Sequence, residues 1–146
     1  MNKKFMIGMD VGSTTVKSVV IDAATDQIVW RDYQRHDTKQ PEKCLEFLKR
    51  FEEEVDGFKA ENARMFITGS GGSGFGKYLG SKFVQEVNAV SLAVEKLYPE
   101  CGSVIELGGQ DAKIIIFNPS KASTGPANRA TCKSLRSTCA AAAANS

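Results

Sequence analysis

Short runs of apolar and β-branched residues, separated by turn residues, fill the beginning of the chain. The runs at residues 4–10, 16–21 and 28–35 have the length of strands, and only short turns lie between them. Consecutive strands joined by short turns pair antiparallel. The pattern therefore predicts a three-stranded antiparallel meander.

Helical spacing and further strand runs alternate after the meander. A helix is predicted from Pro41 to Gly57 and a second one over residues 85–98. The apolar positions that define them are Cys44, Leu48, Phe51 and Val55 in the first, and Val87, Val90, Val94, Leu97 and Tyr98 in the second. Strand runs follow at residues 64–68 and 103–117, the latter interrupted by two glycines. The order β-β-β-α-β-α-β predicts an α/β fold with a mixed five-stranded sheet and helices on its faces.

The chain changes character after Phe117. Residues 118–146 contain one large apolar residue, Leu135, and a run of alanines near the end. Such a segment cannot bury enough apolar surface to offset the entropy lost on ordering it. We therefore predict one lobe over residues 1–117, followed by a tail over residues 118–146 that is disordered or forms a frayed helix.

Composition narrows the class of protein. The formal net charge of +2 is too small to indicate nucleic-acid binding. No stretch approaches the ~20 apolar residues that span a bilayer, and residues 5–9 are too few for a secretory leader. The cysteines show no CxxC spacing, so we expect a cytoplasmic protein with reduced thiols. In such a protein Cys44 and Cys101 are expected to pack rather than to bind a metal.

The first candidate site is the turn between the first two predicted strands, Asp10–Lys17. A phosphate site needs backbone N–H groups that converge on oxygens, and Gly12 permits the tight turn that this requires. Hydroxyl donors and a cation follow it, namely Ser13, Thr14, Thr15 and Lys17. Asp10 ends the strand and is placed to hold Mg²⁺ through its waters. The alternative is a polar hairpin turn that the aspartate caps.

A second stretch, Glu106–Lys113, has the same chemistry. An acid is followed by the double glycine Gly108–Gly109 and by the polar residues Gln110 and Asp111. Two such loops could each present an acid and a glycine turn to one triphosphate from opposite sides. The alternative is an ordinary Gly-Gly hairpin turn.

A third glycine-rich stretch, Gly69–Lys77, fits two other nucleotide motifs by spacing. Tyr78 stands where a P-loop requires Ser or Thr for Mg²⁺, and no acid ends a following strand where a dinucleotide fold requires one. A flexible loop lining a nucleotide cleft is the preferred interpretation. His36, the one histidine, lies in a polar stretch and is expected at the surface. Cys132 and Cys139 have no recognised metal-binding spacing.

Taken together, these loops resemble the ATPases that activate 2-hydroxyacyl-CoA dehydratases and benzoyl-CoA reductases. The resemblance covers about residues 3–117 and is carried by the motifs Met9–Lys17, Thr68–Gly71 and Val104–Lys113. The Gly-Gly-Gln-Asp-x-Lys stretch in the last of these is the most specific. Glu106 stands where the wider superfamily more often has aspartate.

The resemblance implies the N-terminal lobe of an RNase-H-like, actin-like ATPase, in which ATP and Mg²⁺ lie between two lobes. By carry-over, Asp10 and Glu106 would be the catalytic residues that organise Mg²⁺, through water, and the attacking water. The phosphates would be gripped by Gly12, Ser13, Thr14, Thr15, Lys17, Gly108, Gly109, Gln110, Asp111 and Lys113.

It also implies a homodimer that shares one 4Fe–4S cluster and uses ATP hydrolysis to drive an electron into a CoA-ester dehydratase or reductase. Cys132 falls near the place of the first cluster cysteine. The residues after it, Lys-Ser-Leu-Arg, differ from those that follow this cysteine in the family. We therefore expect the first lobe of an activator ATPase. A small-molecule kinase of the same fold and a non-enzymatic assembly or regulatory module remain the alternatives.

Overall fold

The computed structural model of the protein describes residues 3–107, 112–117 and 131–135, the last of these by their backbone only. The chain forms two compact units, Met1–Glu86 and Val87–Ser146. The first unit contains a mixed sheet in the order β3-β2-β1-β4-β5. Its strands are β1 (Phe5–Val11), β2 (Thr15–Asp22), β3 (Ile28–Arg35), β4 (Ala63–Thr68) and β5 (Lys82–Phe83).

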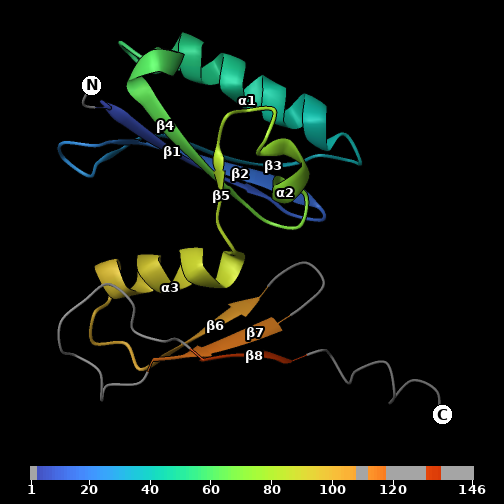
Figure 1. The fold of residues 1–146 in the computed structure, drawn as a ribbon, viewed down its shortest axis with the longest axis vertical. Coiled ribbons are helices and arrows are strands. Elements are labelled where there is room, and N and C mark those ends of the chain that lie inside the picture. Colours follow the sequence, from blue (N-terminus) through green and yellow to red (C-terminus); the bar gives the residue numbers. More distant parts are fainter. Residues whose placement is uncertain (1–2, 108–111, 118–130, 136–146) are drawn as a thin grey trace. The chain divides into compact units, whose positions relative to one another are not determined.

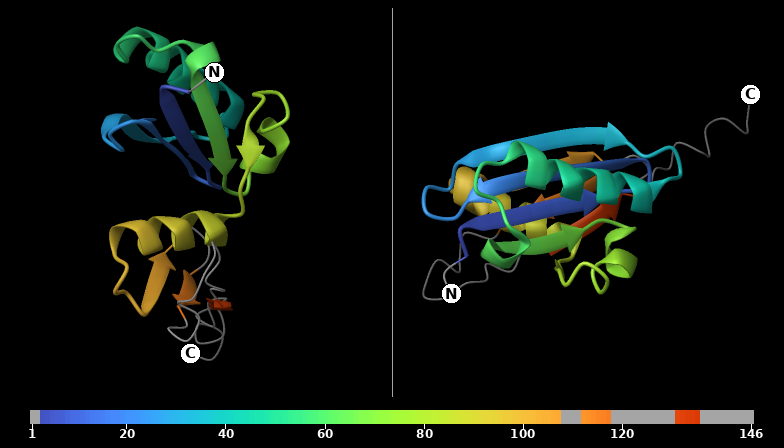
Figure 2. Two further views of the ribbon diagram at one scale, coloured as in Figure 1. Left: turned by 60° about the vertical axis from the view of Figure 1, so that its left-hand side comes forward. Right: turned by 90° about the horizontal axis from the view of Figure 1, so that it is seen from above.

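The first three strands form the antiparallel meander that the sequence predicts. β4 then lies parallel to β1 on its other side, which places β1 at the centre of the sheet. Parallel neighbours require a crossover connection, and the helix α1 (Gln40–Glu54) provides it. Figures 1 and 2 show α1 lying along one face of this sheet. The mixed five-stranded α/β sheet is thus confirmed.

The identity of the fifth strand differs from the sequence-based expectation. The edge strand is β5, a two-residue strand parallel to β4, and not the run at residues 103–117. A strand of this length has too few positions to show an alternating pattern. The glycine-rich stretch also contains a short helix, α2 (Gly72–Phe75), where a loop was expected, and a 3₁₀ turn, η1 (Ala60–Asn62), precedes β4.

The core of the first unit lies between the sheet and α1. Alternate residues of β1 are buried on the face that α1 covers, as the period of two in a strand requires. The buried side chains of α1 meet them, and Trp30 of β3 packs edge-on against Phe51 with ring centroids 4.7 Å apart. The core residues are Phe5, Ile7, Met9, Val11, Val16, Val20, Trp30, Cys44, Phe47, Phe51, Val55 and Ile67.

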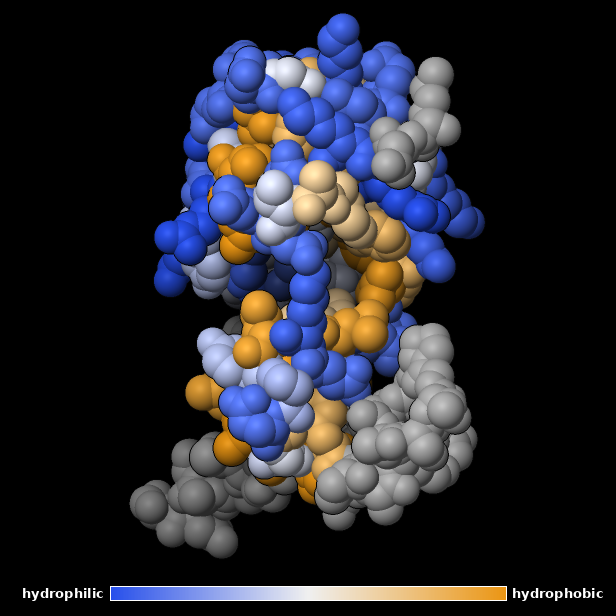
Figure 3. All heavy atoms as spheres, turned by 90° about the vertical axis from the view of Figure 1, so that its left-hand side faces the viewer, coloured by the Kyte–Doolittle hydropathy of each residue, from blue (hydrophilic) through white to orange (hydrophobic). Residues whose placement is uncertain are grey.

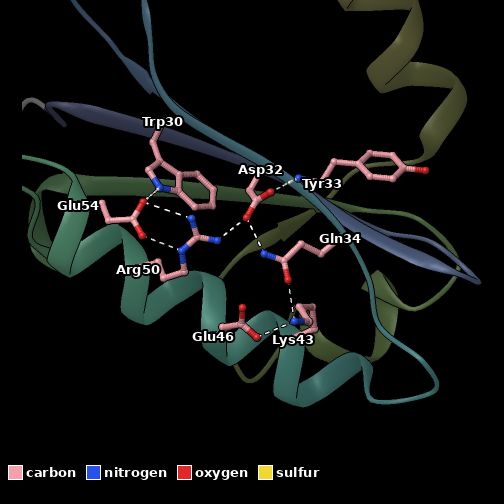
Figure 4. A network of polar contacts seen from close by, with 8 residues as sticks. All are labelled: Trp30, Asp32, Tyr33, Gln34, Lys43, Glu46, Arg50 and Glu54. Atoms are coloured by element: carbon pink, nitrogen blue, oxygen red, sulfur yellow. Dashed lines mark hydrogen bonds and ion pairs between the residues drawn. The ribbon is translucent and has the colours of Figure 1, made fainter.

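A polar network fixes the outer side of α1 to the edge strand β3 (Figure 4). Arg50 donates to Asp32 on β3 and, at 2.7 Å, to Glu54 one turn along its own helix. Its guanidinium also lies 5.0 Å from the centroid of the Trp30 ring, whose Nε1–H donates to Glu54 at 2.6 Å. Lys43 extends the network to Gln34 at 2.7 Å. These contacts set the position of α1 along β3.

The network shifts the titration of its acids. Partial burial alone would raise the pKa of Asp32, but hydrogen bonds from Arg50 and Gln34 outweigh it and hold the pKa below its ordinary value. The hydrogen bonds from Arg50 and Trp30 lower the pKa of Glu54. Both carboxylates are therefore held in their charged form by the fold.

The second unit contains α3 (Glu86–Leu97) at its start and a separate antiparallel sheet in the order β6-β7-β8. β6 (Ser103–Leu107) and β7 (Ala112–Ile116) pair with each other as a hairpin, so they are not one continuous strand of the first sheet. Pairing a run with its immediate neighbour costs little loop-closure entropy, which favours the hairpin over a distant partner. α3 matches the second predicted helix.

Thr131–Leu135 forms β8 along β7, where the sequence led us to expect disorder or a frayed helix. The free edge of β7 offers a row of backbone N–H and C=O groups, and these can order a segment with few apolar side chains. The rest of residues 118–146 lies outside the described residues. The division into a lobe over residues 1–117 and a tail stays a prediction.

The second unit buries few of its large apolar side chains in the described part, where Ile115 is fully enclosed. Figure 3 shows apolar side chains at the surface of the protein, and those of the second unit that are exposed are Leu92, Leu97, Tyr98, Ile105, Leu107 and Ile116. Among the helices that the structure describes, none has the length and apolar content needed to cross a bilayer.

Replacing Arg50 with Ala is expected to lower the free energy of unfolding near neutral pH by about 1 kcal/mol. Because folding lowers the pKa values of Asp32 and Glu54, their contribution is present above their unfolded-state pKa values, about 4, and is lost as the pH falls through the folded-state values. R50A should therefore lose stability less steeply in acid than the parent chain. Urea denaturation at several pH values tests this.

Lys49→Ala is the matched control, since Lys49 is an exposed residue of the same helix. An acid slope in R50A equal to that of the parent chain would show that the network does not set the titration of these carboxylates.

Candidate phosphate-binding site

The turn between β1 and β2 carries the first predicted site. Asp10 and Lys17 lie directly opposite each other in the register of the two strands, and Lys17 Nζ lies 2.8 Å from Asp10 Oδ2. Partial burial would lower the pKa of Lys17, but the hydrogen bond to Asp10 outweighs it, and the pKa lies above its ordinary value. The amine is therefore charged, and it partly neutralises the aspartate.

The four residues after β1 form a tight turn closed by the Gly12 N–H, which donates to the Thr15 carbonyl at 2.9 Å. Ser13 and Thr14 are exposed at the tip, whereas Thr15 is buried. Within the described part of the chain the Ser13 and Thr14 N–H groups make no hydrogen bond. These two amides, and not that of Gly12, are the backbone donors that the turn leaves for an anion. The phosphate contacts of these residues stay a prediction.

The glycine turn after β4 packs directly against this hairpin. The Gly71 N–H donates to the Val11 carbonyl at 2.9 Å. Gly69 has φ +88°, and a Cβ at this position would overlap the Val11 carbonyl oxygen and Asp10 Oδ1. The close approach of two backbone segments therefore requires glycine at position 69, whereas a Cβ at Gly71 would meet the side chains of Val11 and Gln40. The motif Thr68–Gly71 is thus a structural partner of the first loop.

Thr68 begins the motif Thr68–Gly71 but is not among the site residues that the sequence predicts. It lies beside Asp10 in the parallel register of β1 and β4. Asp10 Oδ1 and Thr68 Oγ1 are both buried and have no hydrogen-bond partner in the structure. Buried polar atoms without partners are rare in folded proteins, which makes the pair unusual. The signal available in the sequence was the place of Thr68 at the head of the Thr-Gly-x-Gly motif.

These two oxygens fit the needs of Mg²⁺. The ion keeps several waters and binds through one or two carboxylates, so one aspartate beside a hydroxyl acceptor is a suitable donor set. Metals that require three or more protein ligands have a different need: among the described residues, no cluster of three His, Cys, Asp or Glu side chains could hold such an ion.

The sheet face opposite α1 is hollowed next to these residues. The hollow has a volume of about 580 Å³ and is lined by all strands of the meander and by β4. Asp10, Lys17 and Thr68 stand at its wall, and Phe66 and Tyr33 supply apolar surface. An acid, a cation and apolar walls are the features of a small-molecule site.

The second predicted site has the same arrangement in the second unit. Glu106 and Lys113 lie opposite each other in the register of the β6–β7 hairpin, and Lys113 Nζ lies 3.6 Å from Glu106 Oε2. The glycine turn itself, with the predicted phosphate contacts of Gly108, Gly109, Gln110 and Asp111, lies outside the described residues. The role of Glu106 as a Mg²⁺ and water ligand stays a prediction.

Three backbone amides of the third glycine-rich stretch are already bonded within the protein. The N–H groups of Gly71, Gly72 and Gly76 donate to the carbonyls of Val11, Gly69 and Gly72. Backbone donors that are already bonded cannot cradle a phosphate. The interpretation as a P-loop is therefore disfavoured by the structure as well as by Tyr78.

The expectation for His36 was wrong. The residue is 5% exposed, and its ring lies against the turn between β1 and β2. Nothing in the local sequence shows this, because the ring contacts the turn between β1 and β2, and the strands β2 and β3 separate that turn from His36 in the sequence.

Cys44 is buried in the core, and burial raises the pKa of its thiol to about 11, as expected of a packing residue. Cys132 lies in β8, whose side chains are not described, and Cys139 lies outside the described residues. The iron–sulfur assignment of Cys132 stays a prediction.

The sheet order and the covering helix define a lobe of the actin-like fold. The crystal structure of component A of (R)-2-hydroxyglutaryl-CoA dehydratase from Acidaminococcus fermentans shares this fold, with a TM-score of 0.70, 21% identity and coverage of 90% of this chain and 47% of that chain. The activator of 2-hydroxyisocaproyl-CoA dehydratase from Clostridium difficile, solved with ADPNP bound, gives a TM-score of 0.63, 24% identity and coverage of 88% and 45%.

The sequence is 29% identical over 115 residues to the activator of lactoyl-CoA dehydratase from Anaerotignum propionicum, covering 76% of this chain and 41% of that protein. No protein-family model matches the sequence. The chain is thus homologous to activators of 2-hydroxyacyl-CoA dehydratases, and it spans less than half the length of these relatives.

Replacing Gly69 with Ala is expected to lower the free energy of unfolding by about 2–4 kcal/mol, because the new Cβ meets the backbone of β1 at a positive φ. Gly74→Ala is the control, since a Cβ there meets no atom within 4 Å and the residue lies in α2. Urea denaturation of both variants measures the difference. Equal stability of G69A and G74A would show that the two backbone segments are not in close contact.

Proposed function

We propose that this chain supplies the first phosphate-gripping lobe of an ATP-hydrolysing activator, one that drives electron transfer into a CoA-ester dehydratase or reductase. The observation that carries the proposal is the β1–β2 hairpin, in which an unpartnered Asp10 oxygen stands beside a turn with two open amides. The homology to dehydratase activators suggests the kind of enzyme to which such a lobe would belong.

In this proposal Asp10 and Thr68 are the residues that would hold a hydrated Mg²⁺. Mg²⁺ would neutralise charge on the phosphate oxygens as the bond to the γ-phosphate breaks. The Ser13 and Thr14 amides donate to a phosphate oxygen, which suits a turn that is fixed before the nucleotide arrives.

Lys17 is already charged, so it can move from Asp10 to a phosphate without gaining a proton. The exchange replaces one ion pair by another, and the aspartate is then free to face the hydrated metal. Glu106 and the turn from Gly108 to Asp111 would provide the matching acid and amides of the second hairpin.

The partner follows from the same proposal. Two of the similar proteins are activators of dehydratases, of lactoyl-CoA dehydratase and of 2-hydroxyisocaproyl-CoA dehydratase. We propose a CoA-ester dehydratase or reductase as the electron acceptor and a second copy of the activator as its dimer partner.

Calorimetric titration of the chain with ADP and ATP, with and without Mg²⁺, tests the proposal. The parent chain is expected to bind Mg-nucleotide, and Asp10→Asn should lower the affinity at least about tenfold while removing the dependence on Mg²⁺. Asp56→Asn, the same charge change at an exposed position, should have no effect. Absence of binding by the parent chain, or equal binding by D10N, would contradict the proposed role of this hairpin.

The reaction separates the activator from a kinase of the same fold. Release of inorganic phosphate from ATP without any acceptor supports the activator. Phosphate transfer that appears only when an acceptor hydroxyl or carboxylate is added supports the kinase.

A further inference from the structure

His36 is buried behind the phosphate hairpin, where it contacts that turn by its ring and by its backbone. Its Nε2 lies 3.3 Å from the Gly12 carbonyl oxygen, and its N–H donates to the Thr14 carbonyl at 3.3 Å. A histidine with 5% of its surface exposed has little access to solvent, so its polar atoms depend on these partners.

The hydrogen bonds determine which ring nitrogen carries the proton. The Thr38 N–H donates to His36 Nδ1 at 3.1 Å, so Nδ1 must be an acceptor without a proton. The proton of the neutral ring is then on Nε2, which faces the Gly12 carbonyl as a donor. The ring is therefore neutral, and its tautomer is set by Thr38.

Gln40 at the start of α1 is a second donor to the same oxygen. Its Nε2 donates to the Gly12 carbonyl at 2.9 Å. A carbonyl oxygen has two lone pairs and can accept both bonds. The Gln40 Oε1 lies against Gly71, where an added Cβ would be 3.0 Å away. Gln40 thus joins the hairpin turn, the glycine turn after β4 and the helix.

The backbone that presents His36 is strained. Asp37 has φ 45° and Thr38 has φ 67°, and a β-branched residue at positive φ is uncommon. The Lys39 N–H donates to the His36 carbonyl at 2.7 Å and closes this turn. Strain of this kind persists where surrounding contacts impose it, and it gathers at functional sites.

We propose that His36 and Gln40 are positioning residues of the phosphate hairpin. Their bonds to the Gly12 carbonyl hold the turn in the conformation that leaves the Ser13 and Thr14 amides open to a phosphate. The identity of the ligand, a nucleotide phosphate, rests on the proposed function. The role of His36 and Gln40 in keeping the turn in one conformation rests on the hydrogen bonds alone.

The hydrogen bonds of the ring to Thr38 and Gly12 require the neutral form of His36. A second proton on the ring would occupy Nδ1, which would then face the Thr38 N–H as donor against donor. The hairpin residues that His36 contacts, Gly12 by its ring and Thr14 by its backbone, carry no charge. The charged groups that line the hollow around His36 are Arg35, Asp37, Lys39, Glu42, Lys43 and Glu46, in which positive and negative charges are equal in number. The bond from the Thr38 N–H to Nδ1 is therefore a condition for holding the turn.

A matched pair of variants tests the two nitrogens separately. In His36→Gln the amide Nε2 can still donate to the Gly12 carbonyl, whereas in His36→Asn the shorter amide can serve Thr38 and not Gly12. The first readout needs no nucleotide: ¹⁵N shifts of the imidazole give the tautomer, and amide hydrogen exchange gives the order of the turn. H36N is expected to speed exchange of the Gly12 N–H roughly tenfold, and H36Q by less than about twofold.

The second readout is the affinity for Mg-ADP. H36N should bind roughly tenfold more weakly than the parent chain, and H36Q should bind nearly as well as the parent chain. Gln40→Met, which keeps the length and removes the donor, should speed exchange of the Gly12 N–H and so covers the case in which H36N fails to fold.

A ring proton on Nδ1 in the parent chain, or unchanged Gly12 exchange in both H36N and Gln40→Met, overturns the inference. If the parent chain binds no nucleotide but H36N still loosens the turn, the proposed function fails and the hold on the hairpin stands.

Discussion

The parallel pairing of β1 with β4 is the contact on which the candidate site depends. It sets Asp10 beside Thr68, and it directs the chain after β4 into a turn that lies against the end of β1. The approach is so close that Gly69 and Gly71 leave no room for a side chain. Without this pairing, the β1–β2 hairpin would be an ordinary turn with an ion pair across it. With this pairing, the glycine turn after β4 packs against the hairpin, and Asp10 Oδ1 is buried without a hydrogen-bond partner.

Most of the first unit could be predicted from the sequence because its signals are local. Alternation in β1 to β3, the helical spacing of α1 and Pro41 at its start each act within a few residues. The run of acid, glycine and lysine from Asp10 to Lys17 likewise pointed to the hairpin. β5 was missed because a strand of two residues is too short to show an alternation of apolar and polar positions. The run after residue 103 was assigned to the wrong sheet because strand partners are set by the whole chain.

The remainder of the site could not be predicted because it is made by contacts between distant segments. His36 was placed at the surface on the evidence of its polar neighbours, yet the strained turn at Asp37 and Thr38 turns it inward against Gly12. Thr68 gains its importance from the register with Asp10. The likeness of the two hairpins could be predicted from the sequence, but the strand register is tertiary information: it sets Asp10 opposite Lys17 and Glu106 opposite Lys113.

The pairing of β1 with β4 also has a consequence for the order of events during folding. The β1–β2 hairpin closes through a short turn, and such hairpins form on the order of microseconds. In the sequence, β2, β3 and α1 lie between β1 and β4. The pairing that sets Asp10 beside Thr68 is therefore non-local and belongs to the slow steps of folding. A nascent chain therefore acquires its acid and its lysine early, but Asp10 does not lie beside Thr68 until β4 has left the ribosome. Synthesis itself separates the appearance of the motif from the appearance of the site.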